Sequence, residues 1–425
     1  AIGTTALTSD TKGDASVAVG HGALYSQNFT TTTSVYNVAV GYHAGVNVTT
    51  GTFNVLIGGL AGDALTDADY NIGVGYAALG ADTLGSRSTA VGHNALAQQN
   101  FTTATDAYNT AVGMLAGYSV TTADSNTLIG GLAGDALTVG GDNVAVGRDA
   151  LGADTKGSSS IAIGRNALAA QNFTTATTAY NVAIGRSAGA AVTTGVSNTL
   201  IGGLAGDALT DADYNVAVGF SALSTSQLGS RSTAIGHEAL KFENPATATD
   251  MYNTAVGFNA GNVVTTGTQN TLIGGLAGDA LTTPANNVAV GYNTLSTDTQ
   301  GSASVAIGVS ALTAQNFTTA TDVYNTAVGA NAGASVTTGF QNTYIGGLAG
   351  DAATASVENV AVGYQALSAD TLGSKNVAVG RMALLSQNFT TAHDAYNVGV
   401  GHNAGQQITT GTQNTLIGGL AGDAL

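Results

Sequence analysis

The chain is built on a strict 72-residue period that contains no insertion or deletion. The segment Gly-Gly-Leu-Ala-Gly-Asp occurs once in each period. Its aspartates stand at Asp63, Asp135, Asp207, Asp279, Asp351 and Asp423. Self-similarity at a fixed period is typical of repeat architectures, in which each copy buries its apolar face against its neighbours. We therefore treat the chain as one continuous repeat domain, 1–425, of six periods, roughly 1–65, 66–137, 138–209, 210–281, 282–353 and 354–425.

A shorter motif within each period centres on a glycine that we call the rung glycine. The first period places rung glycines at Gly3, Gly20, Gly41 and Gly58. Each full period has three 17-residue intervals and one 21-residue interval between them, which gives 24 rungs. The residue before each rung glycine is Val or Ile, and the residue two positions earlier is Val, Ile or Thr. Because β-branched residues favour strands, we expect the Val/Ile column to pack in the core and the earlier position to be partly buried.

Short strands that recur once per rung, separated by Gly, Thr, Asn, Asp and Ser, predict an all-β fold. The expected architecture is a parallel β-solenoid, or β-roll, of 24 coils. Ala stands three positions after the rung glycine in 23 of the 24 rungs, with Thr294 as the exception, so we expect close packing there. Asn or Ser stands four positions before it, and we expect side chains such as Asn37 and Asn54 to form a hydrogen-bonded ladder. Asp63 is expected to cap a turn.

The composition excludes several classes of site. The chain has no Cys, 8% charged residues and a net charge of -16. The lack of Cys excludes disulfides, thiolate metal ligands and cysteine nucleophiles. The acidic balance argues against nucleic acid, whose binding needs clustered Lys and Arg, and no apolar run is long enough for membrane insertion. We therefore expect no metal, no cofactor and no nucleic-acid partner.

The rung motifs carry a resemblance to known fibrous proteins. The strings Ser16-Val-Ala-Val-Gly20 and Asn143-Val-Ala-Val-Gly147 resemble the head repeats of YadA-like trimeric autotransporter adhesins. The longer string Asn37-Val-Ala-Val-Gly-Tyr-His-Ala-Gly45 is equally similar to repeats of bacteriophage tail fibres. The resemblance implies a homotrimeric β-roll rod on a cell surface or virion. We expect the chain to be the repeat region of a longer extracellular fibre or a processed filament subunit.

The position just after the rung glycine is the candidate ligand-contact stripe. Large cationic and aromatic residues gather there, whereas most other positions hold small residues, and such side chains are frequent anchors at binding surfaces. These side chains either contact a ligand, with aromatic faces suited to sugar rings, or shield the surface and fill a subunit seam. The candidates are His21, Tyr42, Tyr76, His93, Arg148, Arg165, Arg186, Phe220, His237, Phe258, Tyr292, Arg381 and His402, and Met114 also occupies the position.

The four extra residues of the 21-residue interval predict a loop that protrudes once per period. This loop contains Asn-Phe-Thr, which is an N-glycosylation sequon. The candidate glycosylation sites are Asn28, Asn47, Asn100, Asn172, Asn316 and Asn388. The fourth period has Asn244 followed by Pro245 and so has no sequon there.

Three other functions find less support in the sequence. Gly58-Gly-Leu-Ala-Gly-Asp63 is similar to the calcium-binding nonapeptide of RTX β-rolls, but it occurs only once per period, whereas that calcium cage needs consecutive turns. An ice-binding face needs Thr on every coil, whereas pairs such as Thr49-Thr50 occur on one coil in four. Six near-identical periods contain no unique catalytic constellation, so a polysaccharide-cleaving enzyme is disfavoured. We expect a non-enzymatic extracellular fibre, either an adhesin or receptor-binding stalk or a phage tail fibre, that associates with itself and contacts a surface glycan or receptor.

Overall fold

The computed structural model describes residues 1–424, and this range contains strands and turns but no helix. The chain divides into two compact parts, which we call the N-terminal unit (Ala1–Asp213) and the C-terminal unit (Tyr214–Leu425). Each unit is a parallel β-solenoid of three-residue strands, one per coil, and the two contain about 24 coils in all. The all-β solenoid predicted from the period is therefore confirmed.

The N-terminal unit has eleven three-residue strands, and Ile2 forms a further bridge to Val19. These strands are β2 (Val17–Val19), β4 (Val38–Val40), β5 (Val55–Ile57), β6 (Ile72–Val74), β8 (Thr89–Val91), β10 (Thr110–Val112), β11 (Thr127–Ile129), β12 (Val144–Val146), β14 (Ile161–Ile163), β16 (Val182–Ile184) and β17 (Thr199–Ile201). Its two-residue strands are β1 (Gly13–Asp14), β3 (Thr33–Ser34), β7 (Gly85–Ser86), β9 (Thr105–Asp106), β13 (Gly157–Ser158) and β15 (Thr177–Thr178).

The C-terminal unit repeats the pattern. Its three-residue strands are β18 (Val216–Val218), β20 (Thr233–Ile235), β22 (Thr254–Val256), β23 (Thr271–Ile273), β24 (Val288–Val290), β26 (Val305–Ile307), β28 (Thr326–Val328), β29 (Thr343–Ile345), β30 (Val360–Val362), β32 (Val377–Val379), β34 (Val398–Val400) and β35 (Thr415–Ile417). Its two-residue strands are β19 (Gly229–Ser230), β21 (Thr249–Asp250), β25 (Gly301–Ser302), β27 (Thr321–Asp322), β31 (Gly373–Ser374) and β33 (His393–Asp394).

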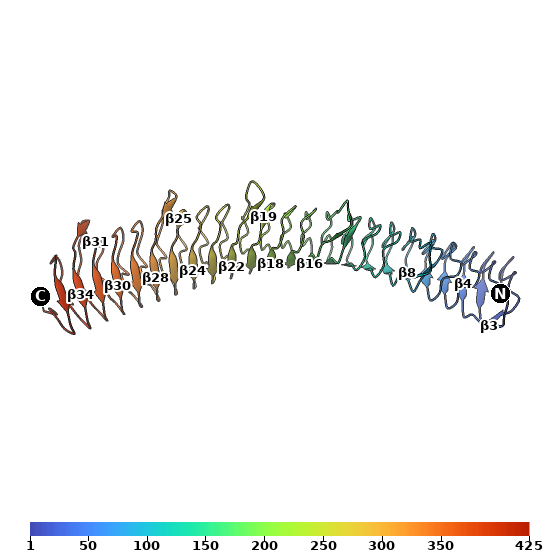
Figure 1. Cartoon of the computed structure of the whole chain (residues 1–425), viewed down its shortest axis with the longest axis horizontal. Coiled ribbons are helices and arrows are strands. Elements are labelled where there is room, and N and C mark those ends of the chain that lie inside the picture. Colours follow the sequence, from blue (N-terminus) through green and yellow to red (C-terminus); the bar gives the residue numbers. More distant parts are fainter. Residues whose placement is uncertain (425) are drawn as a thin grey trace. The chain divides into compact units, whose positions relative to one another are not determined.

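Strands of successive coils pair in parallel and in register, so equivalent residues lie beside each other (Figure 1). In β2 and β4, for example, Ala18 lies opposite Ala39. The 21-residue coils add a second, short pairing, such as β7 with β9. The expected extra loop thus ends in a short strand, such as β9, which pairs with the preceding coil.

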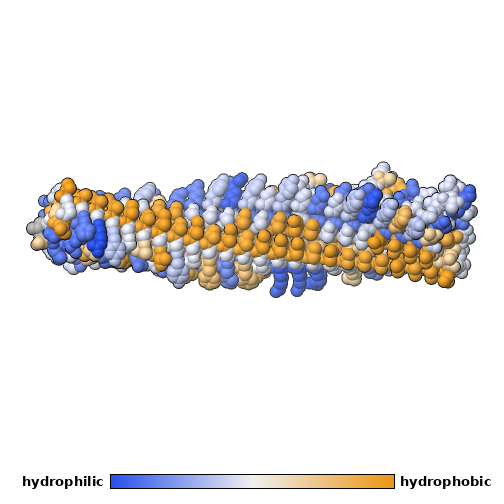
Figure 2. Space-filling model, turned by 90° about the horizontal axis from the view of Figure 1, so that it is seen from below, coloured by the Kyte–Doolittle hydropathy of each residue, from blue (hydrophilic) through white to orange (hydrophobic). Residues whose placement is uncertain are grey.

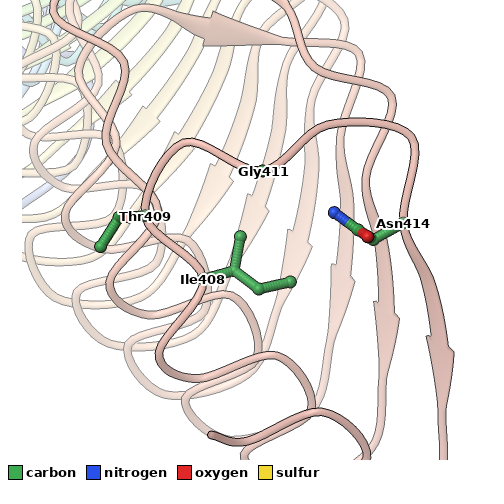
Figure 3. Close-up of a pocket in the computed structure, with 4 residues that line it drawn as sticks. All are labelled: Ile408, Thr409, Gly411 and Asn414. Atoms are coloured by element: carbon green, nitrogen blue, oxygen red, sulfur yellow. The ribbon is translucent and has the colours of Figure 1, made fainter. Parts of the chain in front are cut away.

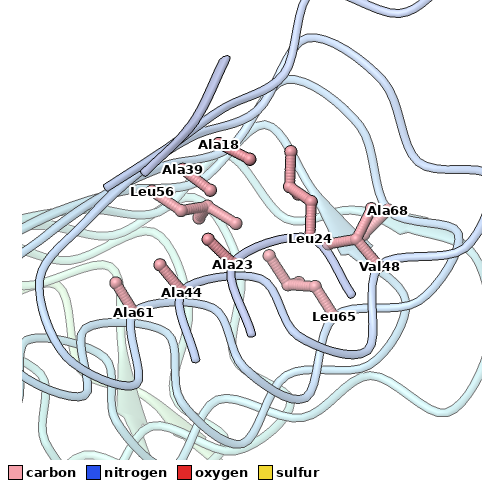
Figure 4. Close-up of a cluster of buried hydrophobic side chains, with 10 residues drawn as sticks. All are labelled: Ala18, Ala23, Leu24, Ala39, Ala44, Val48, Leu56, Ala61, Leu65 and Ala68. Carbon is pink, nitrogen blue, oxygen red and sulfur yellow. The ribbon is translucent and has the colours of Figure 1, made fainter. Parts of the chain in front are cut away.

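The core is built from the central residue of each strand, so the prediction that the residue before the rung glycine packs in the core is wrong. The partial burial expected two positions earlier is found at most strands, for example at Val38 and Thr89. Ala18, Ala39 and Leu56 are fully buried, whereas the flanking Val and Ile residues are half-buried or exposed (Figure 4). We call the residue before each rung glycine the outer Val/Ile column, since it faces away from the core. The interior of a coil this thin is filled by small central residues and by the Ala and Leu that follow the rung glycine.

Volumes inside the coil are matched between neighbouring positions. Around Leu56, the residue four positions after the rung glycine is Gly62 on the same coil and Gly45 on the preceding coil. A Cβ at Gly45 would lie 2.8 Å from the Leu56 Cδ1 atom, and one at Gly62 would lie 2.6 Å from its Cδ2 atom. The larger central side chain therefore requires glycine around it, as expected for a close-packed interior.

The rung glycine allows coils to approach each other at the end of each strand. Its φ angle lies in a region that L side chains rarely adopt, for example 143° at Gly113. A Cβ at Gly113 would overlap the carbonyl oxygen of Gly130 on the next coil and lie 2.6 Å from the carbonyl carbon. Glycine is required here by both the backbone angle and the contact.

Buried Asn side chains tie consecutive coils together beside the strands. Asn37 donates from Nδ2 to the carbonyl oxygen of Gly51 (2.7 Å), and its Oδ1 accepts the backbone N–H of Asn54 (2.8 Å). Asn54 repeats both contacts with Ala68 and Asn71. Each Asn satisfies backbone groups that would otherwise be buried without a partner, so these side chains form a ladder within the unit.

Candidate functional site

The residues that follow the rung glycines form one exposed column in each unit, which we call the post-glycine column. The turn that carries each of them is fixed by bonds between coils, such as His43 N–H to the carbonyl of His21 (2.9 Å). All thirteen candidate residues of the ligand-contact stripe lie in this column and are exposed. The column is interrupted at Gly59, Gly131, Gly203, Gly275, Gly347 and Gly419. Every fourth coil thus lacks a side chain, and the residues stand in groups of at most three.

The fold does not require glycine at these interruptions. At Gly131 the nearest atom to an added Cβ would be the Met114 carbonyl oxygen at 4.0 Å, and at Gly59 it would be a Tyr76 ring carbon at 3.6 Å. Neither residue has a positive φ angle. Glycine at these positions is therefore not needed for folding. The missing side chains separate one three-residue group of the column from the next.

The aromatic members of the column stack on one another. The rings of His21 and Tyr42 lie 5.5 Å apart at 19°, and His237 stands between Phe220 and Phe258 at 5.5 Å from each. Ring faces turned toward a neighbouring ring are not free for a sugar. Contact between sugar rings and the remaining faces of this column stays a prediction.

The arginine group consists of Arg148, Arg165 and Arg186, on three consecutive coils of the N-terminal unit. It lies between the gaps at Gly131 and Gly203. Arg148 has an exposed contact to Asp149 (3.3 Å), and within residues 1–424 neither of the other two has a carboxylate within 4.0 Å. Most other arginines are neutralised: Arg87 pairs with Asp106 and Arg231 with Asp250, both at 2.9 Å.

A second exposed column was missed from the sequence. It occupies the position before the ladder Asn, where Tyr36, Tyr108, Tyr180, Tyr252, Tyr324 and Tyr396 recur once per period. Phe53 and Tyr70 stack there at 5.0 Å and 8°, and the Arg87 guanidinium lies 5.0 Å from the Tyr70 ring. The Asp106 hydrogen bond raises the pKa of Arg87. The repeated Tyr-Asn dipeptide was the signal that could have revealed this column.

The candidate glycosylation sites lie at the start of the extra loop. Asn28, Asn172, Asn316 and Asn388 are exposed and Asn100 is half-buried, and the Oδ1 of Asn100 accepts a bond from Thr83 (3.0 Å). The Phe of each sequon is buried, so the loop protrudes only beyond it. Asn47 is exposed and donates to the carbonyl oxygen of Asp63 (2.8 Å). Glycosylation at these sites stays a prediction.

The repeated aspartates and threonines make contacts within the solenoid. Partial burial raises the pKa of Asp63, and the backbone N–H of the same residue bonds its carboxylate. The Oγ1 atoms of Thr49 and Thr121 donate to the carbonyl oxygens of Thr66 (3.2 Å) and Thr138 (3.0 Å) on the next coil. These hydroxyl groups therefore stabilise the stacking of coils.

A carboxylate beside the 21-residue interval is buried in five of the six periods, and the exception is the half-buried Asp10. In the second period, Asp82 accepts bonds from the backbone N–H of Gly85 and from the side chain of Gln99. In the fourth period the Asp and Gln are replaced by Ser226 and Glu243. Glu243 is fully buried, accepts bonds from Ser232 (3.0 Å) and Asn253 (2.8 Å), and leaves the Ser226 Oγ without a partner.

We expect the stability of the coils around Glu243 to depend on pH. Burial raises the pKa of Glu243 from 4.5 to about 7. Because the folded state disfavours the ionised form, the coils around Glu243 are most stable below pH 4.5 and lose about 3 kcal/mol as the pH rises to 7. Hydrogen exchange of these coils across this pH range measures the loss. In Glu243→Gln the loss should vanish, and an unchanged pH dependence in that variant would contradict the assignment.

The outer Val/Ile column makes a further surface of the molecule. Ile57 and Ile129 are each 39% exposed, and Val112 is 37% exposed. Figure 2 shows apolar side chains gathered in rows on one face of the molecule. The Thr, Val or Ile two positions earlier lies on the same side of each strand, so every coil offers two β-branched residues outward.

Two surface hollows do not resemble ligand sites. One is lined by Ile408, Thr409, Gly411 and Asn414 at the last coil (Figure 3). It is the space that a following coil fills elsewhere, since Val336, the equivalent of Ile408, is fully buried. The other is shallow and lies beside β33. Residues 1–424 contain no group of three or more His, Asp or Glu able to hold a metal ion.

Comparison with protein-family models and with curated proteins finds no match to the chain. Within the described range, no helix is long and apolar enough to cross a membrane.

Proposed function

We propose that the chain is a non-enzymatic structural fibre that assembles as a homotrimer through its outer Val/Ile column and presents its exposed columns to a surface glycan or receptor. The observation that carries the proposal is the outward orientation of Val or Ile on every coil. The extracellular location, as an adhesin or receptor-binding stalk, rests on the resemblance of the rung motif to trimeric adhesin heads. A bacteriophage tail fibre is the alternative, and it uses the same assembly.

A copy of the same chain is the partner that fits the outer column best. The column repeats at the spacing of neighbouring strands, roughly 4.8 Å, over eleven strands of the N-terminal unit alone. A partner must show the same spacing to match such a column along its length, and another copy does so automatically. Closed symmetry then places the same residues of each copy near one axis.

The expected gain from association is large enough to hold copies together. Complete burial of an Ile side chain is worth roughly 1.5–3 kcal/mol. An outer Ile such as Ile129 is 39% exposed, so about 1 kcal/mol per coil remains to be gained. Even after the cost of association, eleven or twelve such coils per unit favour a stable assembly.

Sedimentation equilibrium tests the proposed assembly. The measured mass of the intact protein should be about three times that of one chain, which is 41.6 kDa. The double variant Val112→Glu/Ile184→Glu should have a lower average mass than the intact chain at equal concentration, because carboxylates would be buried between copies without partners. Both residues are already exposed in the single chain, so each copy should still fold.

Val139→Glu provides the matched control. Val139 is 44% exposed and lies outside the outer column, and Asp67 and Asp211 occupy its position in other periods. This variant should keep the mass of the intact chain. A single-chain mass for the unsubstituted protein at micromolar concentration would overturn the proposal.

A further inference from the structure

The arginine group is the most concentrated positive charge on this acidic chain. The chain has ten Lys and Arg against 26 Asp and Glu, yet Arg148, Arg165 and Arg186 stand on consecutive coils, whose strands pair in register. All three side chains are exposed. Glycines at positions 131 and 203 bound the group on both sides, and the fold does not require the glycine at position 131, as its open surroundings show.

This arrangement works against stability. Like charges directly opposite on neighbouring strands are destabilising. Two guanidinium groups at the strand spacing of roughly 4.8 Å repel each other by about 1 kcal/mol in water, before the side chains spread apart. Arg87 and Arg231 are neutralised by Asp106 and Asp250, whereas in the arginine group only Arg148 contacts a carboxylate, that of Asp149. Three neighbouring arginines with one such contact need a reason other than stability.

We propose that Arg148, Arg165 and Arg186 bind a linear acidic polysaccharide, a glycan that carries carboxylate or sulfate groups along its length. This inference names the ligand class for the exposed columns and rests on the proposed function. The three arginines stand in a line on consecutive coils whose strands pair in register, so a single small anion could meet at most two neighbours. Guanidinium groups bind carboxylate and sulfate-like oxygens through paired hydrogen bonds. A chain with one acidic group per sugar or per disaccharide matches a line of arginines.

A glycan fits the group better than nucleic acid does. Nucleic-acid binding draws on many phosphate contacts, commonly six to ten, and the net charge of -16 opposes a dense polyanion. The arginine group offers three cations, and Asn166 and Ser187 lie directly beside two of them in the sequence. Amide and hydroxyl groups are suited to sugar hydroxyls.

Binding assays with defined polymers test the proposal. The intact chain is measured at low salt against polygalacturonate, dextran sulfate, neutral dextran and single-stranded DNA. We expect binding to one or both acidic glycans, no binding to neutral dextran, and a loss of at least tenfold in affinity in Arg148→Gln/Arg165→Gln/Arg186→Gln. Polygalacturonate and dextran sulfate separate a carboxylate ligand from a sulfate ligand.

The control is Lys12→Gln/Lys156→Gln/Lys241→Gln, which removes the same charge from residues outside both exposed columns. It should retain affinity within about threefold. Equal losses in both triple variants, unchanged binding in the first, or binding to DNA alone would overturn the proposal. Sedimentation separates this result from the proposed assembly: the first triple variant should keep the mass of the intact chain, and a fall to the single-chain mass would make the arginines subunit contacts and overturn the glycan site.

Discussion

Gly113→Ala should weaken the coils around it by roughly 3 kcal/mol or more. Gly113 has a φ angle of 143°, which is close to forbidden for residues with a side chain and is worth about 1–3 kcal/mol of strain. The added Cβ would also overlap the backbone of Gly130 on the next coil, and backbone atoms cannot rotate away as a side chain can. Hydrogen exchange of the amides in β8, β10 and β11 measures the change as faster local opening.

Gly131→Ala is the matched control for this prediction. Gly131 directly follows the rung glycine of the next coil, has no positive φ angle, and has open space where a Cβ would stand. Alanine there should change local stability by no more than about 0.5 kcal/mol. Equal destabilisation by both substitutions would show that the rung glycine has no special role, and the close approach of coils would then be wrong.

Asn126→Ala should produce the second large loss, roughly 3 kcal/mol, around β11 and β12. Asn126 is fully buried, donates to the carbonyl of Gly140 (3.1 Å) and accepts the N–H of Asn143 (3.0 Å). Its removal leaves two buried backbone groups without partners, and each costs about 1–3 kcal/mol. Because repeat proteins open locally, hydrogen exchange of the N-terminal unit should change while that of the C-terminal unit stays constant.

Asn126→Asp separates the hydrogen bonds of Asn126 from its volume. The carboxylate is nearly the same size as the amide, but when ionised it cannot donate to Gly140 and is buried as a charge. When protonated, it can donate again. The stability of this variant should therefore rise as the pH falls, whereas that of Asn126→Ala should not. A stability of Asn126→Asp that does not depend on pH would contradict the ladder.

The period of the sequence predicted the strands and the solenoid, but the side of each strand that faces the core was predicted wrongly. In a three-residue strand, either the central residue or the two flanking residues can face the core. β-branched residues usually face a core. The decisive signal was size: the central residue is mostly Ala, whereas Val, Ile and Thr occupy the flanking positions, as in Val38, Ile72 and Thr89. A narrow interior restricts size, so the position that mostly holds the smaller residue is the buried one.

The exposed columns could be predicted only in part. The rung motif placed the post-glycine column correctly, because one residue per coil at a fixed offset must stack. Ring-to-ring stacking at Tyr42 and the pairing of Arg87 with Asp106 depend on rotamers and on contacts between coils, which spacing alone does not give. The replacement of Asp and Gln by Ser226 and Glu243 can be interpreted only from the structure, which shows that both positions belong to one buried group of hydrogen-bonded side chains.

Cysteine cross-linking tests most directly whether the outer Val/Ile column faces outward and meets its counterpart in other copies. The chain has no Cys, so each substituted protein carries a single thiol. Under oxidation, Val112→Cys should give a covalent dimer of about twice 41.6 kDa, since closed symmetry brings equivalent residues together. Val139→Cys should remain uncross-linked, and the thiol of Ala111→Cys should resist alkylation in the folded protein. Rapid alkylation at position 111, or no covalent dimer from Val112→Cys and Ile129→Cys, would contradict this account.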